Sequence, residues 1–395
     1  MAEDEQEVTA NPHTILVVDD EPDLEALVRQ RMRREIRRGV YHFEFAGNGE
    51  EALEVLKKNN AIDIVLTDIN MPRMDGLELL SRMSNLEQEL RSVVVSAYGD
   101  MKNIRQAMNL GAFDFVVKPV DFNDLRVTID RTIKNLMSWR DAMDARNRLV
   151  SIENELGVAK SMQQSILPKS FVATPSHRLY ANMVAAREVG GDFYDFYSLS
   201  DGRIGLAIAD VSGKGVPAAL FMMVSRTLLK SAAGERTDPA DVIRTVNDIL
   251  CADNDSMMFV TMIYAIYDPT THMLSYCNGG HNPMMVVHPD GRTDLFDPHD
   301  GVALGVASDY QYTSHQMELH DGDTLVFYTD GVNEAENSNE ELFGMDRFDE
   351  IFTHGYSDAK SANKAVFSGV HAFVDGHLQS DDITCLTLCV GPDES

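Results

Sequence analysis

The sequence predicts two domains of different fold class, an α/β domain followed by an α+β domain, with a long helix between them. Up to about residue 125, short apolar runs alternate with stretches of helical spacing, which is typical of a parallel α/β sheet. Residues 125–167 contain no proline and only one glycine, which favours a continuous helix. Residues 178–391 are mainly strand-like runs, interrupted by helical stretches, an order that indicates two sheets with helices packed outside.

The composition is that of a globular protein with a large excess of acidic residues. The 395 residues include 34 basic and 63 acidic side chains, which gives a net charge of −29. This charge argues against nucleic acid or an anionic membrane as a partner, because their phosphates would be repelled. No apolar run reaches the roughly 18 residues that span a bilayer, and the acidic tail, residues 1–12, does not resemble a signal peptide. We therefore expect a cytoplasmic protein with reduced cysteines.

The apolar runs of the first domain each end in a polar residue. They are TILVV at 14–18, IDIVLT at 62–67, VVVS at 93–96 and FDFVV at 113–117. Functional groups in parallel sheets lie at the carboxyl ends of strands, so we expect Asp19, Asp20 and Asp68 to meet there. Three carboxylates repel one another unless a hard cation such as Mg²⁺ holds them. A metal-bound carboxylate can also attack a phosphoryl donor, with Lys118 and Ser96 available to bind the added group.

Several strings resemble the receiver domain of bacterial two-component response regulators: VVDDE, LTDINMPRMDG, VVVSAYGD and VVKPV. The resemblance covers residues 14–135 and implies a doubly wound five-stranded parallel sheet. It implies that Asp68 is the phosphoacceptor for a sensor histidine kinase. It further implies that Asp19, Asp20 and the backbone carbonyl of Asn70 hold Mg²⁺, that Ser96 is the switch hydroxyl, and that Lys118 binds the phosphoryl group.

One position departs from the usual receiver pattern. Phe115, three residues before Lys118, stands where many receivers carry tyrosine, so it offers no hydroxyl in the active state. Lys118-Pro119 is a candidate cis peptide, because only an X-Pro bond reaches this form cheaply. The alternative is a degenerate receiver that is never phosphorylated, although all the expected groups are present.

The segment between the domains has the apolar spacing of a coiled coil. Apolar residues recur at 129, 133, 136, 143 and 150, and then at 149, 152, 156, 159 and 166. The two series differ in phase, so we expect one long helix or two abutting helices, ended by Pro168. A half-apolar helix needs a partner. We expect its own copy in a homodimer, and the alternative is packing against the flanking domains.

Four acidic motifs follow in the second domain: GGDFYD, ADVSGKG, YTDGVNEAEN and DDIT. Their lead residues are Asp192, Asp210, Asp330 and Asp381. Carboxylates without histidine or cysteine clusters indicate Mg²⁺ or Mn²⁺ rather than zinc. Two such ions that share a carboxylate and a hydroxide form the usual centre for phosphoester hydrolysis.

These motifs resemble the metal-dependent PPM-type serine/threonine phosphatases, most closely the SpoIIE-like branch. ELGVAKSMQQSILP, AREVGGDFYD, VSGKGVPAALFM and GGHNP match that branch too, so the resemblance covers residues 155–391 and implies an αββα sandwich. It implies that Asp210 bridges two Mn²⁺ or Mg²⁺ ions with the carbonyl of Val211 as the next ligand. It assigns Asp192 to one ion, and Asp330 and Asp381 to the other.

Three further positions are open on sequence alone. Arg187 could bind the substrate phosphate or form a surface ion pair. His281, in GGHNP, is favoured as a turn residue over a proton donor. Asp382 stands where many relatives have asparagine, so it is not expected to be a direct metal ligand.

The sequence thus predicts a tail (1–12), a receiver (13–135), a helical linker (136–170) and a phosphatase (171–395). The function that follows is a response regulator that dephosphorylates a protein. The family resemblance suggests a phosphorylated anti-sigma factor antagonist as the substrate, in partner switching. Two alternatives are a non-catalytic adaptor with a phosphatase-like fold, and a transcription regulator, for which nothing after residue 155 supplies a basic recognition helix.

Overall fold

The computed structural model describes residues 12–86, 88–171, 173–174, 176–252, 254–296, 301–353, 355–356 and 358–392. The predicted acidic tail lies outside the described residues apart from Pro12. The chain divides into two compact units, Met1–Ser151 and Ile152–Ser395.

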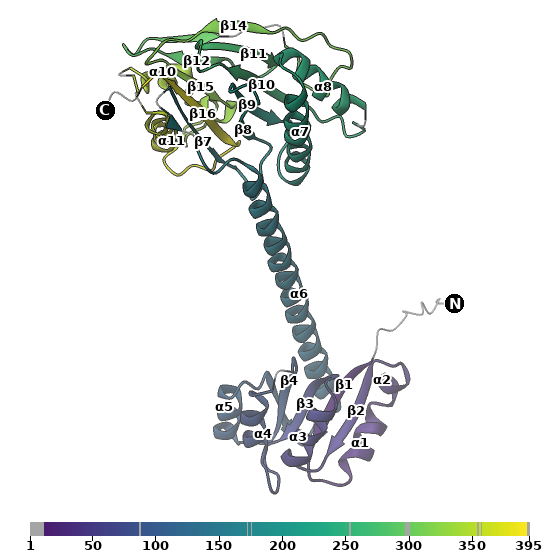
Figure 1. Ribbon diagram of the computed structural model, residues 1–395. Coiled ribbons are helices and arrows are strands. Elements are labelled where there is room, and N and C mark those ends of the chain that lie inside the picture. The colour runs from purple at the N-terminus through teal and green to yellow at the C-terminus, as the bar shows by residue number, and fades with distance from the viewer. Residues whose placement is uncertain are drawn as a thin grey trace. The chain divides into compact units, whose positions relative to one another are not determined.

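The first unit is a parallel five-stranded sheet with the strand order β2-β1-β3-β4-β5 (Figure 1). Its elements are β1 (His13–Val18), α1 (Leu24–Arg31), α2 (Arg33–Arg37), β2 (Tyr41–Ala46), α3 (Gly49–Lys58), β3 (Ile62–Asp68), α4 (Gly76–Met83), β4 (Arg91–Ala97), α5 (Met101–Asn109) and β5 (Asp114–Lys118). Buried side chains of α1 and of the long helix α6 (Phe122–Ile166) cover one face of the sheet. Side chains of α3, α4 and α5 cover the other face, so the sheet is doubly wound as predicted.

Helix α6 is a single helix of 45 residues, which resolves the choice between one helix and two. Its first turns pack on the sheet through Leu125 and Ile129, both buried. Further along, Arg140 contacts the Asp63 carboxylate at 2.7 Å. The helix ends two residues before Pro168, since the residue that precedes a proline disfavours the helical conformation. The boundary between the compact units falls within this helix, after Ser151.

The second unit contains two antiparallel sheets. The first has the order β14-β11-β10-β9-β8 and the second β13-β12-β15-β16-β7-β6. The strands are β6 (Ala173–Thr174), β7 (His177–Val184), β8 (Phe193–Ser198), β9 (Ile204–Val211), β10 (Val260–Tyr267), β11 (Met273–Gly279), β12 (Met284–Val287), β13 (Thr293–Phe296), β14 (His315–Glu318), β15 (Thr324–Tyr328) and β16 (Ile383–Val390). The helices are α7 (Val216–Glu235), α8 (Pro239–Ala252), α9 (Asp330–Asn333), α10 (Gly344–Glu350) and α11 (Ala359–Val374).

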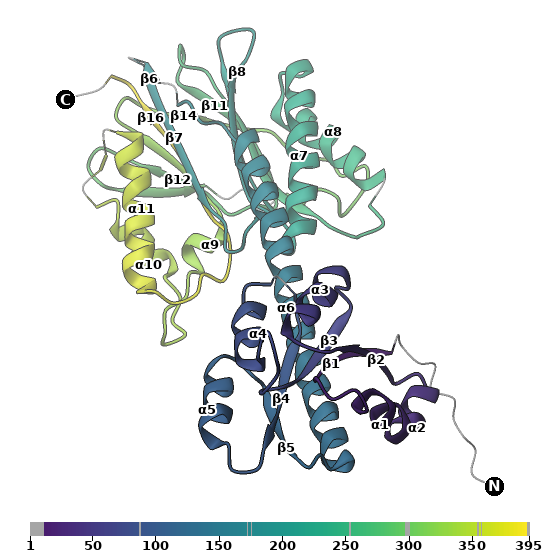
Figure 2. The same cartoon turned by 90° about the horizontal axis from the view of Figure 1, so that it is seen from below.

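The layers of this unit form an αββα sandwich, as predicted. Helices α7 and α8 lie outside the first sheet, and α10 and α11 lie outside the second (Figure 2). One apolar core combines inward side chains of both sheets with those of α7 and α8. A second core joins the outer face of the second sheet to α9, α10 and α11. None of the helices in the described part of the chain is long and apolar enough to cross a membrane.

Candidate functional sites

Three carboxylates meet at the carboxyl ends of β1 and β3 in the first unit. The two strands pair in parallel with Val18 opposite Thr67, so the residues that follow them lie side by side. Asp19, Asp20 and Asp68 each offer an oxygen atom within 4.8 Å of the others. Oxygen donors at this spacing suit Mg²⁺, so the three residues predicted to form this site fit the ion. Asn70 lies beside them, and its backbone N–H donates to Asp68 Oδ1 at 3.3 Å.

Lys118 reaches this cluster from the end of β5. Its Nζ lies 2.6 Å from Asp68 Oδ2 and 3.1 Å from Asp19 Oδ2. Burial lowers the pKa of Lys118, but the hydrogen bonds to Asp68 and Asp19 outweigh it, and the pKa lies above its ordinary value. The side chain therefore remains a cation in contact with the predicted phosphoacceptor. The Lys118-Pro119 peptide is cis, as the sequence suggested.

The remaining receiver positions are Ser96 and Phe115. Ser96 is completely buried, and its hydroxyl has no hydrogen-bond partner. The Phe115 side chain is 37% exposed, so it lies in an outward position. Tyr98, two residues after Ser96, is 91% exposed, as expected for a surface aromatic residue. Gly76 packs on the Asp68 backbone, and a Cβ at this position would lie 2.2 Å from the Asp68 carbonyl oxygen.

The four aspartates of the second unit come from both sheets. Asp210 lies near the end of β9 and Asp192 just before β8, in the first sheet. Asp330 follows β15 and Asp381 precedes β16, in the second. The predicted quartet therefore lies at strand ends of both sheets.

The aspartates of the quartet raise one another's pKa values. Burial, followed by the charges of Asp210 and Asp382, raises the pKa of Asp192 well above its ordinary value. Burial and the neighbouring Asp330 raise the pKa of Asp210 to about 7. Burial and the Asp381 charge also raise the pKa of Asp330. Such mutual repulsion is relieved by a bound cation, so these residues fit divalent metal ions.

The quartet differs in spacing from the receiver cluster. Among the described residues, Asp19, Asp20 and Asp68 form the one group of three or more such ligands within 4.8 Å. A centre for two ions distributes its ligands over a wider space, because each ion takes only some of them. The predicted backbone ligand, Val211, lies beside Gly191, where an added Cβ would lie 2.9 Å from the Val211 carbonyl oxygen.

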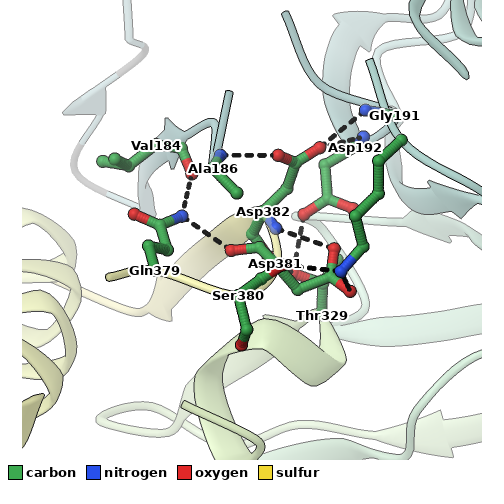
Figure 3. Close-up of polar contacts among 10 residues, drawn as sticks. Val184, Ala186, Gly191, Asp192, Thr329, Gln379, Ser380, Asp381 and Asp382 are labelled. Carbon is green, nitrogen blue, oxygen red and sulfur yellow. Dashed lines mark hydrogen bonds and ion pairs between the residues drawn. The ribbon is translucent and has the colours of Figure 1, made fainter. Parts of the chain in front are cut away.

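Asp382 holds the segment that carries Asp192. Its Oδ1 accepts a hydrogen bond from Ala186 N–H at 2.8 Å, and its Oδ2 accepts one from Gly191 N–H at 2.6 Å (Figure 3). Thr329 then donates its hydroxyl to Asp192 Oδ2 at 2.7 Å. The sequence did not predict Asp382 as a direct metal ligand, and its hydrogen bonds to backbone N–H groups agree with that. Thr329 was not assigned from the sequence, and its only signal is adjacency to the motif residue Asp330.

Lys214 and Gln379 contact the Asp381 segment. Lys214 Nζ lies 2.8 Å from Asp381 Oδ2 and donates to the Ser380 carbonyl at 2.6 Å. The Gln379 amide donates to the carbonyls of Val184 and Asp381 at 2.8 and 2.7 Å (Figure 3).

Gln163 lies near the end of α6, and the sequence indicates it only as part of the string ELGVAKSMQQSILP. Its Nε2 donates to the Gly190 carbonyl at 2.6 Å, and its Oε1 accepts from Gly190 N–H at 3.1 Å. The side chain is buried, with 4% exposed. A glutamine amide that both donates to and accepts from the backbone of one residue fixes that residue in position, here two residues before Asp192.

The structure also describes the surroundings of Arg187 and His281, whose roles the sequence left open, and of Asp195. Arg187 is exposed, and its guanidinium lies beside Gly215 in the loop after Asp210. His281 is buried in a turn closed by Asn278, which accepts from His281 N–H at 2.7 Å. Burial lowers the pKa of His281 to about 4, so its imidazole is neutral near pH 7 and is a poor proton donor. Asp195, from the GGDFYD motif, forms a buried ion pair with Arg226 at 2.8 Å, which indicates a structural role.

The fold and the two carboxylate sites define a receiver domain joined to a PPM-type phosphatase domain. Residues 15–130 match the response regulator receiver domain family, and residues 200–391 match the family "Stage II sporulation protein E (SpoIIE)". The chain therefore belongs to the SpoIIE-type phosphatases and carries a receiver domain before the phosphatase domain. The SpoIIE match begins after Asp192, so this residue is connected with the other aspartates by its sequence motif and by its electrostatic interaction with Asp210.

Individual relatives agree with this assignment. Phosphoserine phosphatase RsbU of Bacillus subtilis is 30% identical over 267 residues, which cover 68% of this chain and 79% of RsbU. Protein IcfG of Synechocystis is 30% identical over 284 residues, which cover 65% of this chain but less than half, 44%, of IcfG. The SiaA-PP2C domain of Pseudomonas aeruginosa matches 61% of this chain and 97% of its own, with a TM-score of 0.53 and 24% identity, and so shares the fold.

Proposed function

We propose that this chain is a response regulator whose output is protein dephosphorylation. A sensor histidine kinase phosphorylates Asp68, and the state of the receiver controls a metal-dependent protein serine/threonine phosphatase. The observation that carries the proposal is the quartet of aspartates at strand ends of the two sheets. Burial and mutual repulsion raise the pKa values of three of them, Asp192, Asp210 and Asp330. The proposed functional division is a receiver at 13–135, a linker at 136–170 and a phosphatase at 171–395.

In the phosphatase domain, Asp210 is the proposed bridging ligand of two Mn²⁺ or Mg²⁺ ions. The Val211 carbonyl and Asp192 complete one side, and Asp330 and Asp381 the other. When bound, such ions would supply a hydroxide nucleophile for the phosphorus atom, whose bond to the serine or threonine oxygen would break. Arg187 is the proposed residue that binds the substrate phosphate, and its exposure and its position beside Gly215 in the loop after Asp210 support this role.

In the receiver, an Asp68 carboxylate oxygen forms the new bond to phosphorus while the bond from phosphorus to the kinase histidine breaks. Asp19, Asp20 and the Asn70 carbonyl would hold Mg²⁺, which would neutralise part of the added charge. Lys118 already touches Asp68 and can follow the charge onto the phosphoryl group. The buried Ser96 hydroxyl, which lacks a partner, is available to donate to a phosphoryl oxygen.

Helix α6 is the proposed connection between the two events. It begins at Phe122 against the receiver sheet and ends at Ile166. Near its end, Gln163 binds both polar groups of Gly190, and Gly190 lies two residues before Asp192. A rotation or displacement of this helix would therefore move a metal ligand.

The same helix is the proposed interface of a homodimer. Leu149 is 62% exposed and Ile152 is 53% exposed, and both belong to the apolar series that continues through Leu156 and Ala159. Exposed apolar side chains at this spacing are typical of a helix that pairs with another. All four cysteines are free thiols, which is consistent with the proposed cytoplasmic location.

The proposed substrate is a phosphoserine or phosphothreonine on an anti-sigma factor antagonist. The support is similarity to RsbU, which is named a phosphoserine phosphatase. The test is release of phosphate from a phosphorylated antagonist with Mn²⁺, with and without beryllofluoride on the receiver. We expect release that Asp210→Asn abolishes. No release in any receiver state would contradict the enzyme and favour a non-catalytic adaptor.

A further inference from the structure

Lys214 makes an ion pair with one of the proposed metal ligands. It lies in the loop between β9 and α7, and its ammonium is 2.8 Å from Asp381 Oδ2. The other carboxylate oxygen, Oδ1, accepts the backbone N–H of Asp382 at 2.9 Å. Both carboxylate oxygens of Asp381 therefore have a partner: a backbone N–H for Oδ1 and the Lys214 ammonium for Oδ2.

The ion pair between Lys214 and Asp381 is partly exposed, and Lys214 lies in a loop that can change conformation. The Lys214 and Asp381 side chains are 40% and 34% exposed, and ion pairs of such exposure contribute little to stability because water screens them. Gly213 and Gly215 flank Lys214 with φ values of 85° and 75°, a backbone region that glycine adopts without strain. The ammonium can thus leave Asp381 at low cost.

The Asp381 main chain has contacts besides the hydrogen bond that Lys214 donates to the Ser380 carbonyl at 2.6 Å. The Gln379 amide bridges the carbonyls of Val184 and Asp381, and so attaches this segment to the end of β7 (Figure 3). The backbone N–H of Asp382 also orients the Asp381 carboxylate. Removal of the Lys214 charge should therefore leave the carboxylate in place.

We propose that Lys214 is an internal competitor for the metal ion at Asp381, so that the ammonium and a divalent cation occupy this carboxylate in turn. The inference rests on the proposed function, in which Asp381 is a metal ligand. An ammonium in contact with a ligand oxygen would lie within about 5 Å of an ion bound to that oxygen, and two cations at this distance repel strongly. Lys214 must therefore move away when the ion binds, and it lowers the metal affinity of this half of the centre.

The test measures Mn²⁺ binding to the full chain by electron paramagnetic resonance of the free ion, at constant ionic strength. Lys214→Met removes the ammonium but keeps the length of the side chain. Lys364→Met, at an exposed position on α11, removes the same charge elsewhere in the unit and serves as the matched control. We expect Lys214→Met to tighten one Mn²⁺ site of the phosphatase domain about 10-fold, since both the competing contact and the repulsion between the two cations are lost. Lys364→Met should leave the affinity within about twofold.

Hydrogen exchange of residues 379–383 provides a second measurement that does not depend on activity. Tighter binding by Lys214→Met, with exchange in the Mn²⁺-loaded protein equal to that of the unmodified chain, supports the proposal. Unchanged or weaker binding, or faster exchange of this segment in the loaded variant, overturns it and makes Lys214 a positioning residue. Asp210→Asn tests the proposed metal centre separately from the competition by Lys214. If this variant binds as many ions as the unmodified chain, the proposed metal centre is wrong, and the proposed competition is wrong as well.

Discussion

Asp382 accepts the backbone N–H of Gly191 at 2.6 Å, although the two residues are 191 positions apart in the chain. Its other oxygen accepts Ala186 N–H at 2.8 Å. One carboxylate therefore fixes both ends of the segment that leads to Asp192, and it does so from the residue next to Asp381. A residue just before β16 of the second sheet in this way positions a proposed metal ligand just before β8 of the first sheet.

We expect Asp382→Ala to lower kcat at least 10-fold and to raise the Mn²⁺ concentration needed for half-maximal activity. Hydrogen bonds to a charged acceptor contribute about 1.5–3 kcal/mol each, and two are lost. Asp382→Asn should be intermediate, because an amide oxygen can replace only one of the two acceptors. Glu318→Ala, an exposed carboxylate on β14, is the control. Normal metal dependence of Asp382→Ala would refute this positioning role.

A second prediction concerns Gln163. Replacement by leucine leaves the buried N–H and carbonyl of Gly190 without partners, which costs about 1–3 kcal/mol for each group. We expect Gln163→Leu to bring the ratio of phosphatase activity with and without beryllofluoride close to 1, since α6 no longer holds the segment before Asp192. Gln164→Leu, its exposed neighbour, should keep the response. A normal response of Gln163→Leu would show that the signal uses another route.

The sequence predicted the two folds and the aspartates because both depend on local patterns. Apolar runs that end in Asp19 and Asp68 identify strand ends of a parallel sheet, and Asp210 follows a comparable run. Asp382 and Gln163 act through long-range hydrogen bonds to backbone groups, and a backbone partner leaves no trace in the sequence. For the same reason the orientation of Phe115 and the contact of Lys214 with Asp381 required coordinates.

Ser96 allows stability and signalling to be separated. Its buried hydroxyl has no partner, so Ser96→Ala removes no hydrogen bond from the resting protein. We expect the free energy of unfolding to stay within about 0.5 kcal/mol or to rise slightly. In contrast, the beryllofluoride response of the phosphatase should fall several-fold, because no hydroxyl meets the bound group. A large loss of stability measured by urea denaturation would mean that the hydroxyl has a partner in solution.

The homodimer proposed through α6 can be tested by substitutions in this helix. Sedimentation velocity should give the mass of two chains, and Ile152→Glu should raise the dissociation constant at least 10-fold by burying a charge at the interface. Asn154→Glu, two residues away and exposed, adds the same charge off the apolar series and should have little effect. A single-chain mass for the unmodified protein at all concentrations would refute pairing through α6.

The aspartate quartet predicts a conflict between stability and metal binding that depends on pH. Burial and Asp330 raise the pKa of Asp210 from 3.8 to about 7. A carboxyl group whose pKa is raised by folding binds its proton more tightly in the folded state. Its stabilising contribution is therefore complete below about pH 3.8 and is lost as the pH rises through about 7.

We therefore expect the metal-free Asp210→Asn variant to become more stable than the unmodified chain as the pH rises from 4 to 7. The difference should reach roughly 1–3 kcal/mol near neutral pH, because the neutral amide avoids the repulsion among buried carboxylates. Calorimetry in EDTA measures this difference on the transition of the phosphatase domain. Added Mn²⁺ should reverse the order, since only the unmodified chain retains the full set of ligands and ligand binding stabilises the folded state. A difference that is independent of pH would mean that Asp210 is already ionised in the metal-free protein, and the proposed crowding of charge would then be wrong.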